Sequence, residues 1–367
     1  MPEDSFMQAA LQLARNSLFL SDPNPRVGCV IVSASGETLG SGFTQQTGGP
    51  HAEVMALRDA ARLGHDTRGA TAYVTLEPCS HHGRTGPCCD ALLQAGIQRV
   101  VASLTDPNPA VAGQGFERLR AGGVEVIVGP GAAESRELNI GFFSRMIRKT
   151  PWVRMKIAAS LDGTTALANG TSQWITSPEA RADGHAWRAR ASAVLTGIGT
   201  LLQDNPSLNV RLVDTPRQPH RVIVDSALQT PPDARLFEAG GQVWIYTASG
   251  DEAKAAALRA RGATVTVIAG ARGKVDLAAL MRDLAAREVN ELHVEAGFKL
   301  NGSLLREGLV DELLVYLAPK LLGQGMGMAA ISELAKLDGA LNLEFASVDR
   351  VGRDLRLLAR VQGRGAF

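Results

Sequence analysis

Residues 49–53 read Gly49-Pro50-His51-Ala52-Glu53, and residues 76–89 read Leu76-Glu77-Pro78-Cys79-Ser80-His81-His82-Gly83-Arg84-Thr85-Gly86-Pro87-Cys88-Cys89. One imidazole and two separated thiols supply three protein ligands for zinc, and a water molecule in the fourth position completes the coordination of a catalytic zinc. Glu53 lies about 200° further round a helix than His51, which suits a proton carrier better than a second ligand. This stretch predicts a hydrolytic zinc centre.

The spacing of the thiols narrows the choice of ligands. The order His-x-Glu…Pro-Cys…Cys is the signature of zinc deaminases, which have two residues between the cysteines, whereas eight residues separate Cys79 from Cys88. Neighbouring side chains on a helix diverge by about 100°, so Cys88 and Cys89 cannot both reach one metal ion. We expect Cys88 to be the ligand because it is nearer the start of a helix, where a thiolate is favoured.

The alternative is a closed zinc site that only stabilises the fold. Its fourth ligand would be His81, His82 or Cys89. A carboxylate in the position of Glu53 has no purpose in a closed site, so we favour the open, hydrolytic form.

Composition and charge exclude several classes of protein. The chain has 367 residues, of which 45% are hydrophobic and 20% charged, and this predicts a globular protein of two domains. The formal net charge of +1 gives no footprint for a long nucleic acid. Residues 1–20 resemble an amphipathic helix and not a signal peptide, and no apolar run reaches the roughly 18 residues of a membrane span. All four cysteines lie in the first quarter, which is unlike a secreted disulfide scaffold, and we expect a cytoplasmic location.

Hydrophobic periodicity in the first half alternates between strands and helices. We expect strands at Val27–Ser33 (with Cys29 as a buried apolar residue), Ala72–Leu76, Arg99–Leu104 and Val124–Val128. We expect helices at residues 4–19, from His51 onward, at Pro87–Ala95 and at Gln114–Ala121. Such alternation predicts an α/β layer fold.

The second half repeats this alternation after an expected domain boundary at Lys149-Thr150-Pro151, which divides residues 1–147 from residues 150–367. We expect strands at Trp152–Ala159, Ala193–Thr196, Arg221–Val224, Val243–Tyr246, Thr264–Ile268, Glu291–Glu295 and Glu312–Pro319. We expect helices at Pro178–Arg190, Asp251–Arg261, Asp276–Arg287 and Lys299–Arg306, the first of them capped by Ser177. A Gly-x-Gly-x-x-Gly fingerprint is absent, which argues against a Rossmann domain, but the turn at Gly297 and a flexible loop at Gly323–Gly327 are glycine-rich.

Several motifs resemble the bifunctional deaminase–reductase family of bacterial riboflavin biosynthesis. In the first half these are Asp22–Gly28, Thr75–Asp90 and Thr105–Pro109; in the second they are Lys156–Thr165, Ser172–Ser177 and Asp204–Leu208. The resemblance implies a cytidine-deaminase-like three-layer α/β domain followed by a dihydrofolate-reductase-like α/β domain. It also implies deamination of a diaminopyrimidinone ribosylamine phosphate, followed by reduction of its ribosyl group to ribityl with NADPH.

For the deaminase half, the resemblance implies that one zinc ion is bound by His51, Cys79 and Cys88, with Glu53 as the catalytic proton shuttle. It implies substrate contacts at Asn24, His81, Arg84, Asp106 and Asn108. By their residue types alone, Asp106 and Asn108 also suit plain turn chemistry in Asp-Pro-Asn-Pro. The family commonly has a histidine close to Gly42, where this chain reads Phe43-Thr44-Gln45.

For the reductase half, the resemblance implies two sets of contacts. NADPH contacts are implied for Ala158, Trp174, Thr200, Asp204, Ser226, Gly297, Phe298, Lys299, Leu300, Asn301, Gly302 and Ser303. Substrate contacts are implied for Lys156, Ser172, Arg188, Leu208, Arg211 and Glu295. Without the resemblance, either arginine suits a solvated charge, Trp174 suits a core residue, and Lys156 suits an ion pair with Asp162. Phe298 stands where the family often has proline, so we expect a shifted turn there.

We therefore expect a cytoplasmic enzyme that acts on a small phosphorylated pyrimidine and forms a homo-oligomer, either a dimer or a tetramer. Two other classes remain open. One is a deaminase of free or polynucleotide bases with an unrelated second domain, against which the near-neutral charge argues. The other is a non-catalytic binding protein with a degenerate zinc site, against which the intact Glu53 argues.

Overall fold

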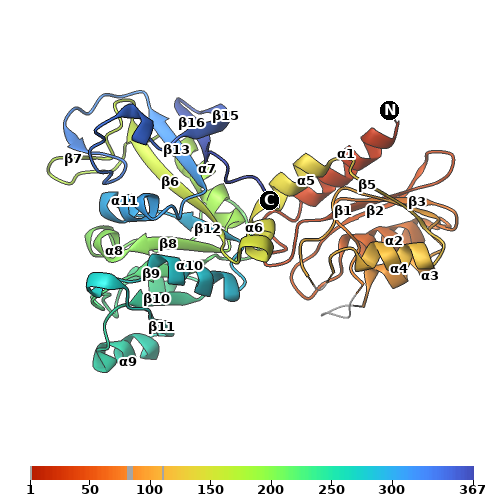
Figure 1. The fold of residues 1–367 in the computed structure, drawn as a ribbon, viewed down its shortest axis with the longest axis horizontal. Helices are drawn as coiled ribbons and strands as arrows, with labels where there is room; N and C mark the ends of the chain where they lie inside the picture. Colours follow the sequence, from red (N-terminus) through yellow and green to blue (C-terminus); the bar gives the residue numbers. More distant parts are fainter. Residues whose placement is uncertain (1, 81–85, 110) are drawn as a thin grey trace. The chain divides into compact units, whose positions relative to one another are not determined.

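The computed structural model describes residues 2–80, 86–109 and 111–367, and the chain divides into two compact units, Met1–Arg148 and Lys149–Phe367 (Figure 1). Within these residues, the first unit is built on a five-stranded sheet. The second unit is built on a nine-stranded sheet with a separate two-stranded ribbon. Each unit buries its own apolar residues.

The sheet of the first unit is mixed. Its strands follow the order β2 (Thr38–Phe43), β1 (Gly28–Val32), β3 (Thr71–Val74), β4 (Arg99–Ala102) and β5 (Glu125–Val128). β1 pairs antiparallel with both β2 and β3, whereas β3, β4 and β5 run parallel. The carboxyl ends of β3 and β4 therefore lie side by side, and the loops that follow them meet at one edge of the sheet.

Helices cover both faces of this sheet. α1 (Pro2–Arg15) packs Met7 and Leu11 against Val30 and Tyr73, and α5 (Ala132–Leu138) lies beside it. The other face is covered by α2 (Ala52–Leu63), α3 (Cys88–Gln94) and α4 (Gln114–Ala121), which form one layer (Figure 1). α6 (Ile140–Arg148) ends the unit. The result is a three-layer α/β arrangement, as the sequence predicts.

Glycines in β2 allow an unusually close approach of α2. A Cβ atom at Gly42 would lie 2.5 Å from the amide nitrogen of Ala56 and 2.6 Å from the carbonyl oxygen of Ala52. A Cβ atom at Gly40 would lie 2.4 Å from the carbonyl oxygen of Ala56. The backbone of α2 therefore rests directly on the backbone of β2, which sets the position of the helix that begins after His51.

The sheet of the second unit is parallel over seven strands and ends in an antiparallel hairpin. The order is β11 (Ala263–Val267), β10 (Val243–Thr247), β9 (His220–Val224), β8 (Ala193–Gly197), β12 (Glu291–Val294), β6 (Trp152–Ser160), β13 (Glu312–Ala318), β16 (Asp354–Val361) and β15 (Leu343–Val351). Antiparallel pairing begins at β13 with β16. β7 (Ala166–Leu167) and β14 (Gly325–Met326) form the separate ribbon.

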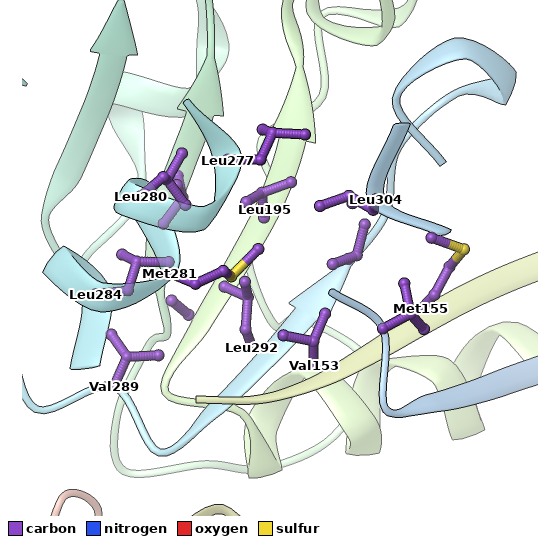
Figure 2. Packing of buried hydrophobic residues seen from close by; sticks show 14 of the residues in the cluster. Val153, Met155, Leu195, Leu277, Leu280, Met281, Leu284, Val289, Leu292 and Leu304 are labelled. Carbon is purple, nitrogen blue, oxygen red and sulfur yellow. The ribbon is translucent and has the colours of Figure 1, made fainter. Parts of the chain in front are cut away.

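Alternate residues of these strands face two helical layers. α10 (Leu277–Ala286) and α11 (Phe298–Arg306) cover one face, where Leu280 and Met281 pack near Leu195 and Leu292 (Figure 2). α7 (Pro178–Arg190), α8 (Ile198–Asp204) and α9 (Glu252–Ala260) cover the opposite face. Three short 3₁₀ helices occur in the described part of this unit, at Arg235–Glu238, Ala271–Gly273 and Leu337–Gly339.

The expected elements are present, with ends displaced by a few residues. Pro87 caps α3 from outside instead of lying in its first turn. The sequence did not predict β2, β7, β14, β15, β16, α5, α6 or α8. Among the described residues, no helix combines the length and apolar character that crossing a bilayer requires.

Candidate functional site

Three side chains of the first unit converge at one end of its sheet. His51 caps α2, Cys88 is the first residue of α3, and Cys79 lies in the loop after β3. The Nδ1 atom of His51 is 3.6 Å from Sγ of Cys79 and 3.3 Å from Sγ of Cys88. All three ligand atoms lie within 4.8 Å of one another.

These distances fit a zinc ion. With Zn–N bonds of about 2.0 Å and Zn–S bonds of about 2.3 Å, tetrahedral geometry places a nitrogen and a sulfur ligand roughly 3.5 Å apart. Cys89 is directed elsewhere, since its Sγ donates to the carbonyl oxygen of Pro78 at 3.2 Å and contacts that of Gly115 at 3.4 Å. Of the two adjacent cysteines, Cys88 therefore faces the cluster, and among the described residues His51, Cys79 and Cys88 are the three that gather as metal ligands.

Glu53 lies in the first turn of α2, immediately behind the cluster, with 3% of its surface exposed. Burial raises the pKa of its carboxyl to about 7, against the opposing charge of His51. A group that titrates near neutral pH both accepts and releases a proton readily. The position and the pKa of Glu53 suit proton transfer beside the cluster.

The two thiols do not ionise as the helix position alone suggests. Hydrogen bonding with Cys88 and His51 lowers the pKa of Cys79 to about 4, despite its burial. The thiolate of Cys79, together with burial, raises the pKa of Cys88. The amide of Cys88 donates to Sγ of Cys79 at 3.4 Å, which favours the thiolate of Cys79. A divalent metal ion favours thiolates at both positions.

Glu77 is a structural organiser of the site that sequence reasoning missed. It has 4% of its surface exposed and accepts three backbone N–H groups. Oε2 accepts from Asp106 at 3.0 Å and from Gly113 at 2.9 Å, and Oε1 accepts from Gly115 at 2.9 Å. This carboxylate fastens the loop after β4 to the loop that carries Cys79, two residues away.

The structure describes three of the five expected substrate contacts of this unit, which are Asn24, Asp106 and Asn108. Asp106 is buried and accepts the amide of Asn108 at 2.8 Å, which is the turn chemistry expected for Asp-Pro-Asn-Pro; burial raises the pKa of Asp106 to about 7. Asn24 lies in the turn after α1, where its amide donates to Ser21. His81 and Arg84 lie outside the described residues.

The second unit contains a cavity of about 880 Å³ at the carboxyl ends of β6, β8 and β12. Open α/β sheets bind ligands at such ends. Ten residues of the expected reductase site line it: Lys156, Ala158, Ser172, Trp174, Arg188, Thr200, Asp204, Leu208, Arg211 and Glu295. Trp174 is 62% exposed, with the guanidinium of Arg181 4.5 Å from its ring centroid, so it presents a flat face and is not a core residue.

A buried charge network lies on the wall of this cavity. Arg188 donates from Nη2 to Oε2 of Glu295 at 2.8 Å and from Nε to Oε1. Burial alone would raise the pKa of Glu295, but the charge of Arg188 and its hydrogen bonds hold that pKa well below its usual value. Burial lowers the pKa of Lys156, while Glu295 opposes this shift. Asp162 bonds instead with Ser160, Leu322 and Gly323, so it does not serve as the expected alternative partner of Lys156.

Comparison with known proteins decides the family. Residues 2–104 match the cytidine and deoxycytidylate deaminase zinc-binding region, and residues 151–357 match the RibD C-terminal domain. The chain is 45% identical to the riboflavin biosynthesis protein RibD of Escherichia coli, over 97% of this chain and 99% of that protein. The chain belongs to the RibD family. It is also 39% identical to the RibD protein of Aquifex aeolicus, over 96% of this chain and 97% of that protein.

Solved RibD structures share the whole fold. RibD of Acinetobacter baumannii superposes with a TM-score of 0.89 at 38% identity, over 98% of this chain and 99% of that one. A diaminohydroxyphosphoribosylaminopyrimidine deaminase/5-amino-6-(5-phosphoribosylamino)uracil reductase of Thermotoga maritima superposes with a TM-score of 0.86 at 33% identity, over 98% and 99% of the two chains. The expected fold class is confirmed: a cytidine-deaminase-like domain precedes a dihydrofolate-reductase-like domain.

Membership of the RibD family confirms the two activities and their cofactors. The chain is a bifunctional enzyme of riboflavin biosynthesis, a zinc-dependent deaminase and an NADPH-dependent reductase, and it acts on a small molecule.

Thr44 and Phe298 are the two positions at which we expect a departure from the family pattern. Thr44, near the place of a family histidine, is buried, and its hydroxyl bonds to both the amide and the carbonyl of Val27, so it joins β2 to the start of β1. Phe298 is the first residue of α11, after an extended Gly297. Proline is favoured at that helical position, and α11 begins there without one.

Other expected cofactor contacts of the RibD reductase lie outside the cavity lining. Ser226 accepts the amide of Val275 at 3.2 Å, next to the end of β9. Within the segment Gly297–Ser303, Gly297 faces Thr200, which itself lines the cavity. The side chain of Asn301, in α11, donates to the carbonyl oxygen of Met328 at 3.0 Å, so it holds the segment around Met328 against this helix.

The cavity residues that sequence reasoning missed include His185, Arg235 and Tyr316. His185 belongs to α7, Arg235 begins a 3₁₀ helix, and the hydroxyl of Tyr316 in β13 donates to Asp183 at 2.6 Å. These residues come together only in the folded chain, because each belongs to a different segment and none belongs to a recognised motif. The sequence alone offered no means of grouping them.

Proposed function

We propose that residues 1–147 deaminate 2,5-diamino-6-ribosylamino-pyrimidinone 5′-phosphate, with zinc held by His51, Cys79 and Cys88 and with Glu53 as the proton carrier. The convergence of those three ligand atoms in front of a buried carboxyl on the same helix supports this most strongly. A solved structure that shares the whole fold belongs to a protein named for this deaminase activity.

The residues of this unit divide the work of hydrolysis. A zinc ion bound there lowers the pKa of its water molecule toward about 7 and so supplies a nucleophile at neutral pH. Glu53 would accept a proton beside the three ligands and pass it to the amine that leaves the ring as ammonia. Asn24 holds the base, and His81, Arg84, Asp106 and Asn108 hold the sugar phosphate. Glu77 keeps the last two within reach by its three backbone hydrogen bonds.

We propose that residues 150–367 then reduce the deaminated product to 5-amino-6-ribitylamino-uracil 5′-phosphate. The cavity fits a dinucleotide and a sugar phosphate, since it combines a flat aromatic face at Trp174 with several basic side chains. Cofactor contacts fall to Ala158, Trp174, Thr200, Asp204, Ser226 and residues 297–303. Substrate contacts fall to Lys156, Ser172, Arg188, Leu208, Arg211 and Glu295.

NADPH, when bound, supplies the hydride that reduces the anomeric carbon of the ribose. The C–O bond to the ring oxygen breaks, and that oxygen needs a proton. Lys156 is placed to give it, because burial lowers its pKa and so eases release of its proton. Glu295, held ionised beside it by Arg188, stabilises the charge of Lys156 before transfer.

A two-stage assay of the full chain tests the order. With zinc and the pyrimidine substrate, ammonia is released without NADPH; NADPH is then oxidised only after ammonia appears. Glu53→Gln blocks both stages from the pyrimidine but leaves reduction of supplied deaminated intermediate intact. Ammonia release from single-stranded nucleic acid, but not from the pyrimidine, would contradict the proposed substrate.

We also propose a cytoplasmic homo-oligomer, a dimer or tetramer built through the second unit. Large apolar side chains are exposed along residues 321–355, among them Leu337 at 90% and Phe345 at 69%. β15 is an edge strand of its sheet, and exposed apolar edges favour pairing with another chain. Sedimentation of the full chain and of Phe345→Glu tests this: the variant should shift toward monomer.

A further inference from the structure

The reductase cavity carries an excess of positive charge. Five lining residues are basic and two are acidic. The basic residues are Lys156, Arg181, Arg188, Arg211 and Arg235, and the acidic residues are Asp204 and Glu295. Uncompensated cations in one cavity are costly in the absence of an anion, because they repel one another. Their presence indicates an anionic ligand group, and the question is which of these side chains meet it.

Arg188 has few donors left for a phosphate. Its Nε and Nη2 atoms bond to the carboxylate of Glu295, and its Nη1 atom donates to the carbonyl oxygen of Asn209 at 2.9 Å. The fork that would bind a phosphate in bidentate fashion is therefore already bound to a carboxylate. Only two of the five N–H donors of Arg188 remain, so the main phosphate contact falls to other cations.

Arg211 and Arg235 have donors to offer. Arg211 donates from Nη1 to the side-chain oxygen of Asn209 at 3.1 Å, and in the described part of the chain no carboxylate pairs with either arginine. Both line the cavity and are exposed to it, and the repulsion of Arg188 and Arg235 adds to burial in lowering the pKa of Arg211. Both side chains therefore border the same cavity, on which an anionic group of a ligand would meet them.

The backbone holds Arg235 in this place. Arg235 begins a 3₁₀ helix, and its amide donates to the side-chain oxygen of Asn205 at 2.9 Å. Asn205 directly follows α8 and opens the loop that leads to Leu208, a buried residue of the cavity wall. This bond ties a segment remote in sequence to the motif loop, so Arg235 belongs to the built site.

His185 adds to the surplus of donors. With 5% of its surface exposed, it receives the backbone amide of Arg211 at Nδ1, 3.2 Å away, and faces Nη1 of Arg188 at 3.4 Å with Nε2. A neutral imidazole has only one lone-pair nitrogen, so one of these donor contacts is unsatisfied. An acceptor-only group such as a phosphate resolves that conflict.

We propose that Arg235, together with Arg211, binds the phosphate of the reductase substrate and makes the reductase select phosphorylated over dephosphorylated substrate. This rests on the proposed reductase function. Arg235 lies outside the motifs through which the site was expected, and its role follows from the occupied donors of Arg188.

Steady-state reduction by the full chain tests this, with NADPH and either the deaminated ribosylamino-uracil phosphate or its dephosphorylated form. Arg235→Ala should raise KM for the phosphorylated substrate by roughly 10- to 100-fold, the usual loss for one charge-assisted contact, with kcat and KM for NADPH unchanged. Arg235→Lys should recover part of the loss. Inorganic phosphate should inhibit the wild type competitively and the Ala variant more weakly. Arg282→Ala, an exposed arginine of α10 outside the cavity, is the matched control and should behave as wild type.

Two results would overturn the proposal. One is an unchanged preference for the phosphorylated substrate in Arg235→Ala. The other is a rise in KM for NADPH alone, which would assign Arg235 to a phosphate of the cofactor. A wild-type chain without any NADPH oxidation would instead remove the proposed function itself.

Discussion

Arg188 and Glu295 form a two-pronged ion pair on the wall of the reductase cavity, with Nη2 donating to Oε2 at 2.8 Å and Nε donating to Oε1. The pair links α7 to the end of β12, two segments that are adjacent in space only because of the sheet order. Removing one member leaves the other charge buried, so this contact bears on both stability and reduction.

Arg188→Lys keeps the charge but loses the fork, and we expect it to impair reduction. The pKa of Glu295 should rise, because the charge of Arg188 and its hydrogen bonds oppose the effect of burial. We expect the unfolding free energy of the second unit to fall by about 1–3 kcal/mol. All four tryptophans lie in residues 150–367, so urea unfolding followed by tryptophan fluorescence reports this unit selectively. Deamination is the internal control, and a variant with normal reduction and a normal unfolding midpoint would refute the role of the pair.

Zinc content should distinguish the two adjacent cysteines. Cys88→Ser should lose most of the zinc and the deaminase activity, since Sγ of Cys88 lies 3.3 Å from Nδ1 of His51. Cys89→Ser is the matched control and should keep both, because Sγ of Cys89 points to the carbonyl groups of Pro78 and Gly115. Elemental analysis of the purified full chain measures the metal. Equal zinc loss in the two variants would show that the ligand is misassigned.

Glu77→Gln should damage deamination without removing a zinc ligand. One of its oxygens becomes an NH₂ group that opposes a backbone N–H, either at Gly115 or at Asp106 and Gly113. An unmade buried hydrogen bond costs about 1–3 kcal/mol, enough to loosen the loop after β4. We expect KM for the pyrimidine to rise, with reduction of supplied intermediate unchanged. Unaltered deaminase kinetics would show that this loop takes no part in binding.

Acid should destabilise the second unit through His185. Burial, then the charges of Arg188 and Arg211, lowers the pKa of His185 from 6.5 to about 4. Between these values the unfolded chain binds a proton that the folded chain does not, so stability falls as pH falls from about 6.5 to about 4. His185→Gln removes this contribution, so its urea midpoint should drop less than that of the wild type between pH 7 and pH 4.5. Parallel pH profiles for the two proteins would count against a neutral His185.

The sequence predicted most of the fold because its strong periodic segments are also the buried ones. β2 was missed because its glycines resemble a loop, and their purpose becomes visible only against the backbone of α2. β15 was missed because its residues are largely exposed and lack the apolar run of a buried strand. Local sequence patterns show which residues are buried, whereas these two strands form through pairing and packing with segments elsewhere in the chain.

Site prediction had the same limit. Residues 51–53 and 79–88 carry their chemistry in their spacing, and the structure brings the expected side chains together. Glu77, His185 and Arg235 act through contacts with segments 26 to 38 positions away, and a carboxylate or an arginine by itself is an ordinary surface residue. Arg188 was expected to contact the substrate, and only the position of Glu295 shows that its Nε and Nη2 atoms already bond to a carboxylate.

Each unit of this chain has its own sheet and buries its own apolar residues. A substitution that disrupts the core of one unit should therefore impair the activity of that unit and spare the activity of the other. Two chains disabled in opposite halves still possess between them one sound copy of each catalyst, and a freely diffusing intermediate would let such a mixture complete both steps. A cell that expresses both variants should therefore still make riboflavin.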